Sequence, residues 1–171
     1  MNWCLSFVLD PDGMRSFDPM DLSGAAVAEC PDLSPHRTEL HTVVAELYAN
    51  ALEYGVLGLD AGLKDSAAGF EEYYRRRQVR LADLDEGWIR IEMEARTAPG
   101  MVETVVRVKD SGVGFDWQSA SRGPREQARR GRGIGLVRGL CEQVTYNDDG
   151  TEVEAVYRCS GADGAERAGG A

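Results

Sequence analysis

Apolar residues recur along this chain with two different periods, and each period predicts one kind of element. Within 37–54 they recur every three or four positions, as on the buried side of a helix. This stripe comprises Leu40, Val43, Val44, Leu47, Ala51 and Tyr54. Helices are also predicted over 66–83 and 133–142, and a short one over 18–30.

Elsewhere apolar and polar residues simply alternate, which is typical of strands with one buried face. The strands predicted in this way are 3–9, 87–97, 102–109, 144–146 and 151–157. We expect the first of them to lie at the edge of a sheet.

Glycine, proline and aspartate residues predict where these elements stop. Asp10 to Gly13 is interpreted as a turn after the first strand, and 31–35 as a break before the long helix. Gly55 is expected to end that helix as a C′ residue, followed by a turn over 57–64. Residues 98–100 predict a hairpin turn between the strands on either side of them.

Polar residues line one flank of the predicted helix over 37–54. Glu39, Glu46, Asn50 and Glu53 lie on this flank, and Glu46 and Asn50 are one helical turn apart. A polar flank beside a core-facing stripe can line a pocket, whereas a solvated acidic face is the alternative interpretation.

Two glycine-rich segments follow the strand predicted over 102–109. Asp110 comes first, so that the strand delivers a carboxylate, and Gly112 and Gly114 then let the backbone approach a flat ligand closely. The second segment is Gly131-Arg132-Gly133-Ile134-Gly135-Leu136, which leads into a predicted helix. Free N–H groups at a helix N-terminus favour phosphate.

A polar loop over 116–130 separates the two glycine-rich segments and carries several arginines. They are Arg122, Arg125, Arg129 and Arg130. A loop of this length inside a compact domain is uncommon unless it is a lid or disordered. We therefore predict a lid whose arginines reach phosphates, with a plain surface loop as the alternative.

Charge and cysteine content narrow the classes of function. A net charge of −10 argues against a general nucleic-acid binder or a binder of anionic membranes, both of which need a basic surface. The 4 cysteines contain no C-x-x-C pair and make no metal-ligand spacing with His36 and His41, so we expect reduced thiols. Without a signal peptide or a long apolar run, we expect a cytoplasmic protein.

Three motifs together carry a resemblance to a known family. E-x-x-x-N-A-x-E-x-G from Glu46, D-S-G-x-G-F from Asp110 and G-R-G-I-G-L from Gly131 resemble the N, G1 and G2 boxes of the GHKL (Bergerat-fold) ATPases. Within that family the chain resembles the anti-sigma-factor serine kinase branch. It is most similar there to the ATPase domain at the C-terminus of response-regulator serine phosphatases.

This resemblance implies ATP and Mg²⁺ as cofactors and a role for each matching residue. Glu46 would be the general base and Asn50 a ligand of Mg²⁺. Asp110 would accept a hydrogen bond from adenine, with Thr151 beside it, although an ordinary strand threonine is an equal alternative. The remaining predicted nucleotide contacts are Gly112, Gly114, Arg130, Gly131, Gly133, Ile134 and Gly135.

The elements and the resemblance together predict an α/β (α+β) fold. We expect a two-layer sandwich, in which a mixed, mostly antiparallel sheet is covered on one face by the helices at 37–54, 66–83 and 133–142. A single GHKL domain would span 1–160, and 161–171 would be a disordered tail.

The resemblance also implies partners. The phosphate acceptor would be a serine on a small STAS-type anti-sigma antagonist, with a sigma factor or an anti-sigma regulator as a further partner, and a homodimer stays open. One alternative is a non-catalytic, nucleotide-gated binding module, against which the intact Glu46 argues. The other is the ATPase domain of a histidine kinase, but His36 and His41 already lie at or in the helix of the first box.

Overall fold

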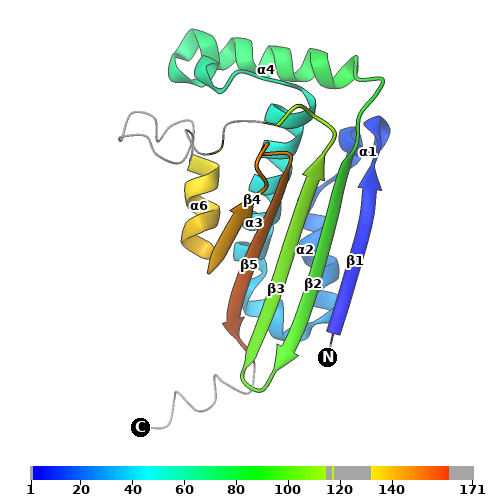
Figure 1. Cartoon of the computed structure of the whole chain (residues 1–171), viewed down its shortest axis with the longest axis vertical. Coiled ribbons are helices and arrows are strands. Elements are labelled where there is room, and N and C mark those ends of the chain that lie inside the picture. Colours follow the sequence, from blue (N-terminus) through cyan, green and yellow to red (C-terminus); the bar gives the residue numbers. More distant parts are fainter. Residues whose placement is uncertain (1, 115–116, 118–131, 162–171) are drawn as a thin grey trace.

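The computed structural model describes residues 2–114, 117 and 132–161 of the chain. These residues form one antiparallel sheet with helices on its inner face (Figure 1). The strands are β1 (Asn2–Leu9), β2 (Ile89–Ala98), β3 (Met101–Asp110), β4 (Gln143–Tyr146) and β5 (Glu152–Ser160). Their order is β1-β2-β3-β5-β4. The predicted fold class is confirmed, and every pairing between the described strands is antiparallel.

Alternation along the strands decides which face of the sheet is buried. Ile89, Ile91 and Met93 of β2 are fully buried, whereas Arg90 between them is exposed. Because successive side chains of a strand point to opposite faces, the apolar set forms the core and the charged set faces solvent. The hydrophobic core therefore lies between the sheet and the helices.

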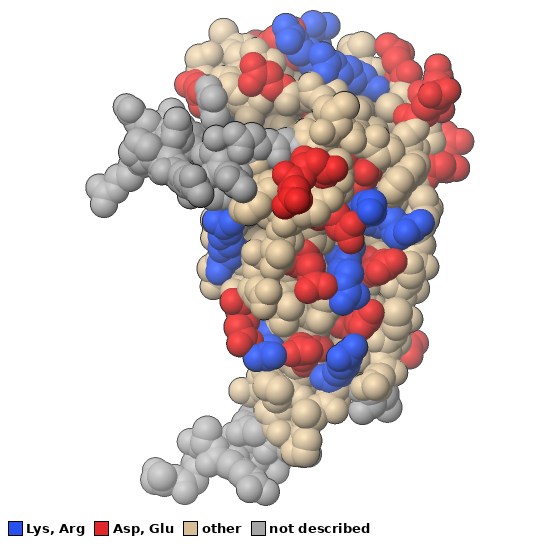
Figure 2. Space-filling view, in the orientation of Figure 1, with Lys and Arg blue, Asp and Glu red and all other residues tan. Residues whose placement is uncertain are grey.

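The outer face of the sheet carries ion pairs that cross from strand to strand. Arg107 of β3 pairs with Glu94 at 2.8 Å and with Glu154 at 2.6 Å, and Arg158 pairs with Glu103 at 2.7 Å. Figure 2 shows acidic and basic side chains interspersed over this face of the molecule. Their side chains are partly exposed, so this face is the solvent side of the sheet, and ion pairs at such a surface contribute little, ~0–1 kcal/mol each.

The helices on the inner face are α2 (Pro19–Glu29), α3 (Arg37–Asn50) and α6 (Arg132–Leu140). The predicted apolar stripe of α3 is confirmed, since Leu40, Val43, Val44 and Leu47 are at most 1% exposed. Among the described residues, no helix is long and apolar enough to cross a membrane.

The helix predicted over 66–83 exists as α4 (Ala67–Ala82), but its predicted place on the sheet is wrong. α4 lies across the end of the sheet in Figure 1 and packs mainly on the short helix η3 (Ala61–Asp65). Its buried Tyr73 donates a hydrogen bond to Glu53, and Arg77 donates another at 2.8 Å. These polar contacts hold α4 at the end of α3.

Two further predictions are wrong. Asp10 caps a short helix, α1 (Pro11–Ser16), instead of starting a turn. The predicted break before α3 is confirmed, since α2 ends at Glu29 and 31–35 lies in a separate 3₁₀ helix, η1 (Pro31–His36). Gly55 does not end the long helix, because α3 continues into a π-helical turn, η2 (Ala51–Val56). The glycine with positive φ after that helix is Gly58, at φ 56°.

Candidate functional site

Asp110 is the last residue of β3, and hydrogen bonds to its backbone and to its side chain fix its position. Its backbone N–H donates to the carbonyl of Thr151 at 2.9 Å, and its Oδ1 accepts from the N–H of Gly112 at 2.8 Å. The residue is only 7% exposed, so its carboxylate is a buried acceptor at the end of the sheet.

Burial raises the pKa of Asp110 to about 6. The hydrogen bond from Gly112 opposes this rise and the nearby charge of Asp149 adds to it. The carboxylate is therefore ionised at neutral pH but close to protonation. A buried carboxylate with a raised pKa is typical of a functional site, because folding alone gains nothing from it.

Glycines let the backbone close in around this carboxylate. A Cβ placed on Gly55 would collide with Oδ1 of Asp110, and a Cβ on Gly112 would collide with the carbonyl oxygen of Gly55. Gly114 has φ 77°, and a Cβ there would collide with the carbonyl oxygen of Asp149. These positions need glycine for close approach, which is what a binding site for a flat ligand requires.

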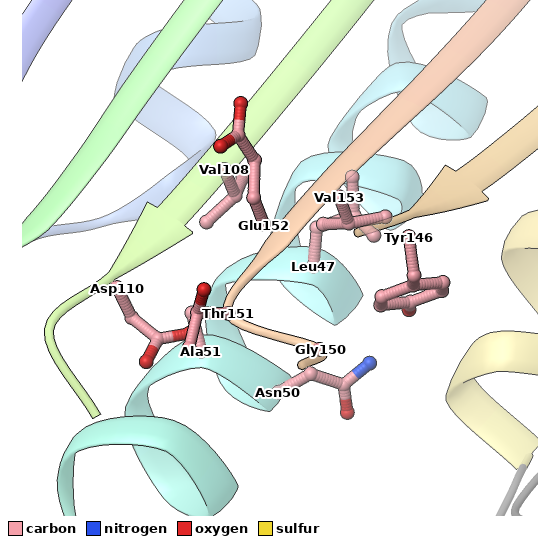
Figure 3. Close-up of a pocket in the computed structure, with 10 residues that line it drawn as sticks. All are labelled: Leu47, Asn50, Ala51, Val108, Asp110, Tyr146, Gly150, Thr151, Glu152 and Val153. Carbon is pink, nitrogen blue, oxygen red and sulfur yellow. The ribbon is translucent and has the colours of Figure 1, made fainter. Parts of the chain in front are cut away.

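A pocket opens beside Asp110, between the end of α3 and the start of β5 (Figure 3). Its enclosed space is only about 10 Å³, and it opens to solvent. Its lining residues are Leu47, Asn50, Ala51, Val108, Asp110, Tyr146, Gly150, Thr151, Glu152 and Val153. An enclosed space of about 10 Å³ is roughly the room that one water molecule needs, so the described residues form a small cavity beside Asp110 and leave no space for a whole nucleotide.

Asn50 places its side-chain amide at this pocket from the last turn of α3. Its Nδ2 is buried, with no acceptor in hydrogen-bond geometry among the described residues. The amide is still close enough to Tyr146 to oppose the effect of burial, which raises the pKa of that tyrosine to about 12. A buried polar group that protein does not fully satisfy is suited to a ligand.

Thr151 lies on the other side of the pocket, and hydrogen bonds fix its hydroxyl. The hydroxyl donates to Asp149 Oδ1 at 2.6 Å and accepts from Asn147 Nδ2 at 3.0 Å. Figure 3 shows Thr151 beside Asp110. An acceptor position on the hydroxyl is left for a ligand donor.

Glu46 lies one turn before Asn50 but does not line the pocket. A Cβ on Gly133 would collide with its Oε2, so the carboxylate lies against the first turn of α6. The N-terminus of a helix attracts negative charge. Glu46 thus lies at the helix start where phosphate was predicted to bind.

The predicted site residues therefore fall into two neighbouring groups. Asn50, Asp110 and Thr151 meet at the pocket, with Gly112 and Gly114 beside them, and Glu46 meets Gly133 at the start of α6. Ile134 is buried in the protein, whereas a Cβ on Gly135 would meet open space. Arg130 and Gly131 lie outside the described residues, as do nearly all of the predicted lid and tail.

The sequence did not indicate three contributors to this site. Gly55 was interpreted as the end of a helix, although its place in the first motif could have indicated a role at the site. Tyr146 and Gly150 also line the pocket, although the sequence indicated only a strand for Tyr146 and no role for Gly150. Lining residues of this kind follow from tertiary packing and leave no periodic signal.

The buried carboxylate, the small pocket and the nearby helix N-terminus are features suited to a nucleotide. A buried carboxylate can accept a hydrogen bond from the amino group of a base, and a helix N-terminus favours phosphate. The family model for the histidine kinase-like ATPase domain matches residues 19–157, and the chain belongs to this family. A comparison with curated proteins finds no significant match. The chain is thus an ATP-binding domain with a GHKL-type fold.

Proposed function

We propose that this domain is an ATP-dependent protein serine kinase of the anti-sigma-factor type. Its acceptor is a serine of a small STAS-type antagonist, and transfer controls a sigma-factor partner switch in the cytoplasm. The observation that supports the proposal is the position of the Glu46 carboxylate, one turn from Asn50 and against the first turn of α6. A binding module needs no carboxylate at that place.

Each residue of the site has a role in this proposal. Asp110 accepts a hydrogen bond from the adenine amino group, and Asn50 supplies a neutral oxygen to Mg²⁺, which keeps other oxygen ligands from water and phosphate. Glu46 accepts the proton of the attacking serine hydroxyl. ATP, bound with Mg²⁺, supplies the phosphoryl group. The N–H groups at the start of α6 orient its phosphates.

The test is phosphoserine formation on candidate antagonist proteins, with nucleotide affinity measured on the same samples. Glu46→Gln keeps the size and hydrogen-bonding capacity of the side chain but removes the base. ATP binding should persist, while transfer falls by ~10²–10⁴, the usual range for general-base catalysis. Glu39→Gln, on the same helix two turns earlier, is the matched control and should leave transfer unchanged.

The alternatives predict different outcomes. If wild type binds ATP and a partner but transfers nothing to any antagonist, the domain is a nucleotide-gated binding module. Phosphate on a histidine of a partner chain would instead indicate the ATPase domain of a histidine kinase. Equal rates for wild type and Glu46→Gln would remove Glu46 as the base.

A further inference from the structure

Glu53 belongs to the first sequence motif, yet it has no place in the site described above. It lies in the π-helical turn η2, and the described residues that line the pocket do not include it. Its side chain is only 13% exposed. Burying a carboxylate is costly unless the group is paired, so the partners of Glu53 indicate its role.

Three donors meet at this carboxylate, and all of them come from the segment that follows η2. Tyr73 of α4 donates its hydroxyl proton to Oε2 of Glu53, and Arg77 donates to Oε1 at 2.8 Å. Burial and the nearby Glu53 raise the pKa of Tyr73, so the hydroxyl keeps the proton that it donates. Lys64 of η3 lies 3.3 Å from Oε2 and 4.1 Å from the centroid of the Tyr73 ring. Glu53 therefore anchors η2 to α4.

A second contact attaches α4 to the same turn. Arg80 donates through Nη1 to the carbonyls of Leu57 and Gly58, at 2.7 and 2.8 Å. These two carbonyls follow directly after η2, which ends at Val56. Helix α4 thus holds η2 through a carboxylate inside the turn and through backbone groups just beyond it.

The opposite side of η2 packs against the acceptor of the pocket without spare room. A Cβ on Gly55 would collide with the carboxylate of Asp110, and a Cβ on Gly112 would collide with the carbonyl of Gly55. A small displacement of η2 would therefore change the position of the carboxylate. A π-helical turn is a rare conformation, often found at functional sites, so contacts outside the turn are needed to hold it.

We propose that Glu53 is a positioning residue for ATP binding. By anchoring η2 to α4, it keeps Gly55 against Asp110 and so fixes the acceptor for the adenine amino group. The described residues of α4 line no part of the pocket, so the effect of α4 on ATP is transmitted through η2. The inference rests on the proposed role of Asp110 and is independent of the serine kinase activity.

The first test is the affinity for ATP, measured by calorimetry well below the unfolding temperature of each variant. Glu53→Gln keeps the size of the side chain but removes the charge that pairs with Arg77 and Lys64. Affinity should fall by roughly 2- to 30-fold, the usual range for residues coupled through one network.

Glu72→Gln is the matched control. Glu72 also pairs with two arginines, Arg75 at 2.7 Å and Arg76 at 2.6 Å, but all three residues lie within α4. This variant should keep the wild-type affinity for ATP.

A double-mutant cycle separates the positioning of Asp110 from a general loss of structure. Asp110→Ala removes the acceptor, so Glu53→Gln should cause no further loss of ATP affinity in that background. A purely structural role for Glu53 would lower the affinity by the same factor in both backgrounds. Asp110→Ala alone tests the role of Asp110, so a failure of that role is distinguishable from a failure of this inference.

Two further measurements keep the inference testable if Glu53→Gln does not fold. Tyr73→Phe removes only the hydroxyl that donates to Glu53 and should show the same pattern with a smaller loss. Because coupling is reciprocal, saturating ATP should also slow amide hydrogen exchange in α4 of wild type, but not in α4 of Asp110→Ala.

Three results would overturn the inference. They are wild-type ATP affinity in a folded Glu53→Gln or Tyr73→Phe variant, equal losses with and without Asp110, and exchange in α4 that ATP leaves unchanged in wild type.

Discussion

The carboxylate of Asp110 occupies space that a side chain on Gly55 would need. The two residues belong to different motifs of the sequence, one at the end of the long helix and one at the end of β3. A Cβ on Gly55 would collide with Oδ1 of Asp110. The absence of a side chain at Gly55 therefore leaves room for the carboxylate of Asp110, which is the hydrogen-bond acceptor of the pocket.

Gly55→Ala should weaken ATP binding by roughly 10- to 150-fold, as if the hydrogen bond to Asp110 were lost, because that bond is worth ~1.5–3 kcal/mol. The introduced methyl group displaces the carboxylate from its place beside Gly112. Calorimetric titration with ATP measures the effect.

A matched control separates this collision from the general effect of alanine in a helix. Gly139 lies in α6, where a Cβ would meet nothing within 4 Å. Gly139→Ala should keep ATP affinity and stabilise the fold by ~0.5–1 kcal/mol. If Gly55→Ala binds ATP as tightly as Gly139→Ala, the position of Asp110 does not depend on residue 55.

Asp110→Asn should weaken ATP binding and increase the free energy of unfolding. The pKa of Asp110 is raised from 3.8 to about 6, so the folded state binds this proton more tightly than the unfolded chain does. The cost to stability is therefore absent below pH 3.8 and complete above about 6. At pH 7.5 the variant should gain about 1–3 kcal/mol in free energy of unfolding, since one pKa unit corresponds to ~1.4 kcal/mol.

Urea unfolding at pH 7.5 and pH 4 measures this difference. The gap between Asp110→Asn and wild type should shrink towards zero at pH 4, where the folded wild type is protonated at this position. The variant should also lose ATP affinity at pH 7.5. A gap of equal size at both pH values would show that burial of the charge is not the cause.

Asn50→Ala should weaken only the Mg²⁺-dependent part of ATP binding. If Asn50 supplies a ligand of the metal, wild type binds ATP more tightly with Mg²⁺ than with EDTA, and the variant loses most of that difference. Asp110→Asn provides the contrast, because it should weaken binding equally in both conditions. The idea fails if Asn50→Ala responds to Mg²⁺ as wild type does.

Tyr73→Phe should destabilise the attachment of α4. Tyr73 is fully buried, and its hydroxyl donates to Glu53, a carboxylate that also accepts from Arg77. A hydrogen bond to a charged group contributes ~1.5–3 kcal/mol, which is the expected loss in free energy of unfolding. Tyr74→Phe, at a neighbouring ring that is 45% exposed, should change stability by less than ~0.5 kcal/mol.

The sequence predicts the strands and the long helix well because their periods report directly which face is buried. The stripe from Leu40 to Leu47 shows this most clearly. Asp10 to Gly13 was misassigned because a turn and a helix cap use the same local bond. Here the side chain of Asp10 accepts from the N–H of Gly13 at 2.8 Å, and the chain continues as a helix.

Partners in space are harder to predict than elements. The spacing within α4 indicates a buried stripe but not what covers it, and Tyr73 turned out to face Glu53 rather than the sheet. The residues of the site likewise include some that a local pattern indicates and some that it does not. Asp110 could be recognised at the end of a strand, whereas the close approach of Gly55 joins residues far apart in the sequence and leaves no local signal.

The π-helical turn at Ala51–Val56 requires a set number of residues in this segment of the chain. The N–H of Leu57 donates to the carbonyl of Leu52, five residues earlier, so the turn holds one residue more than an α-helical turn would. Deleting a single residue there would restore regular helix. It would also rotate Glu53 away from α4 and move Gly55 from beneath Asp110. We therefore expect insertions and deletions to be excluded from 51–56, a segment in which every residue is buried or half-buried.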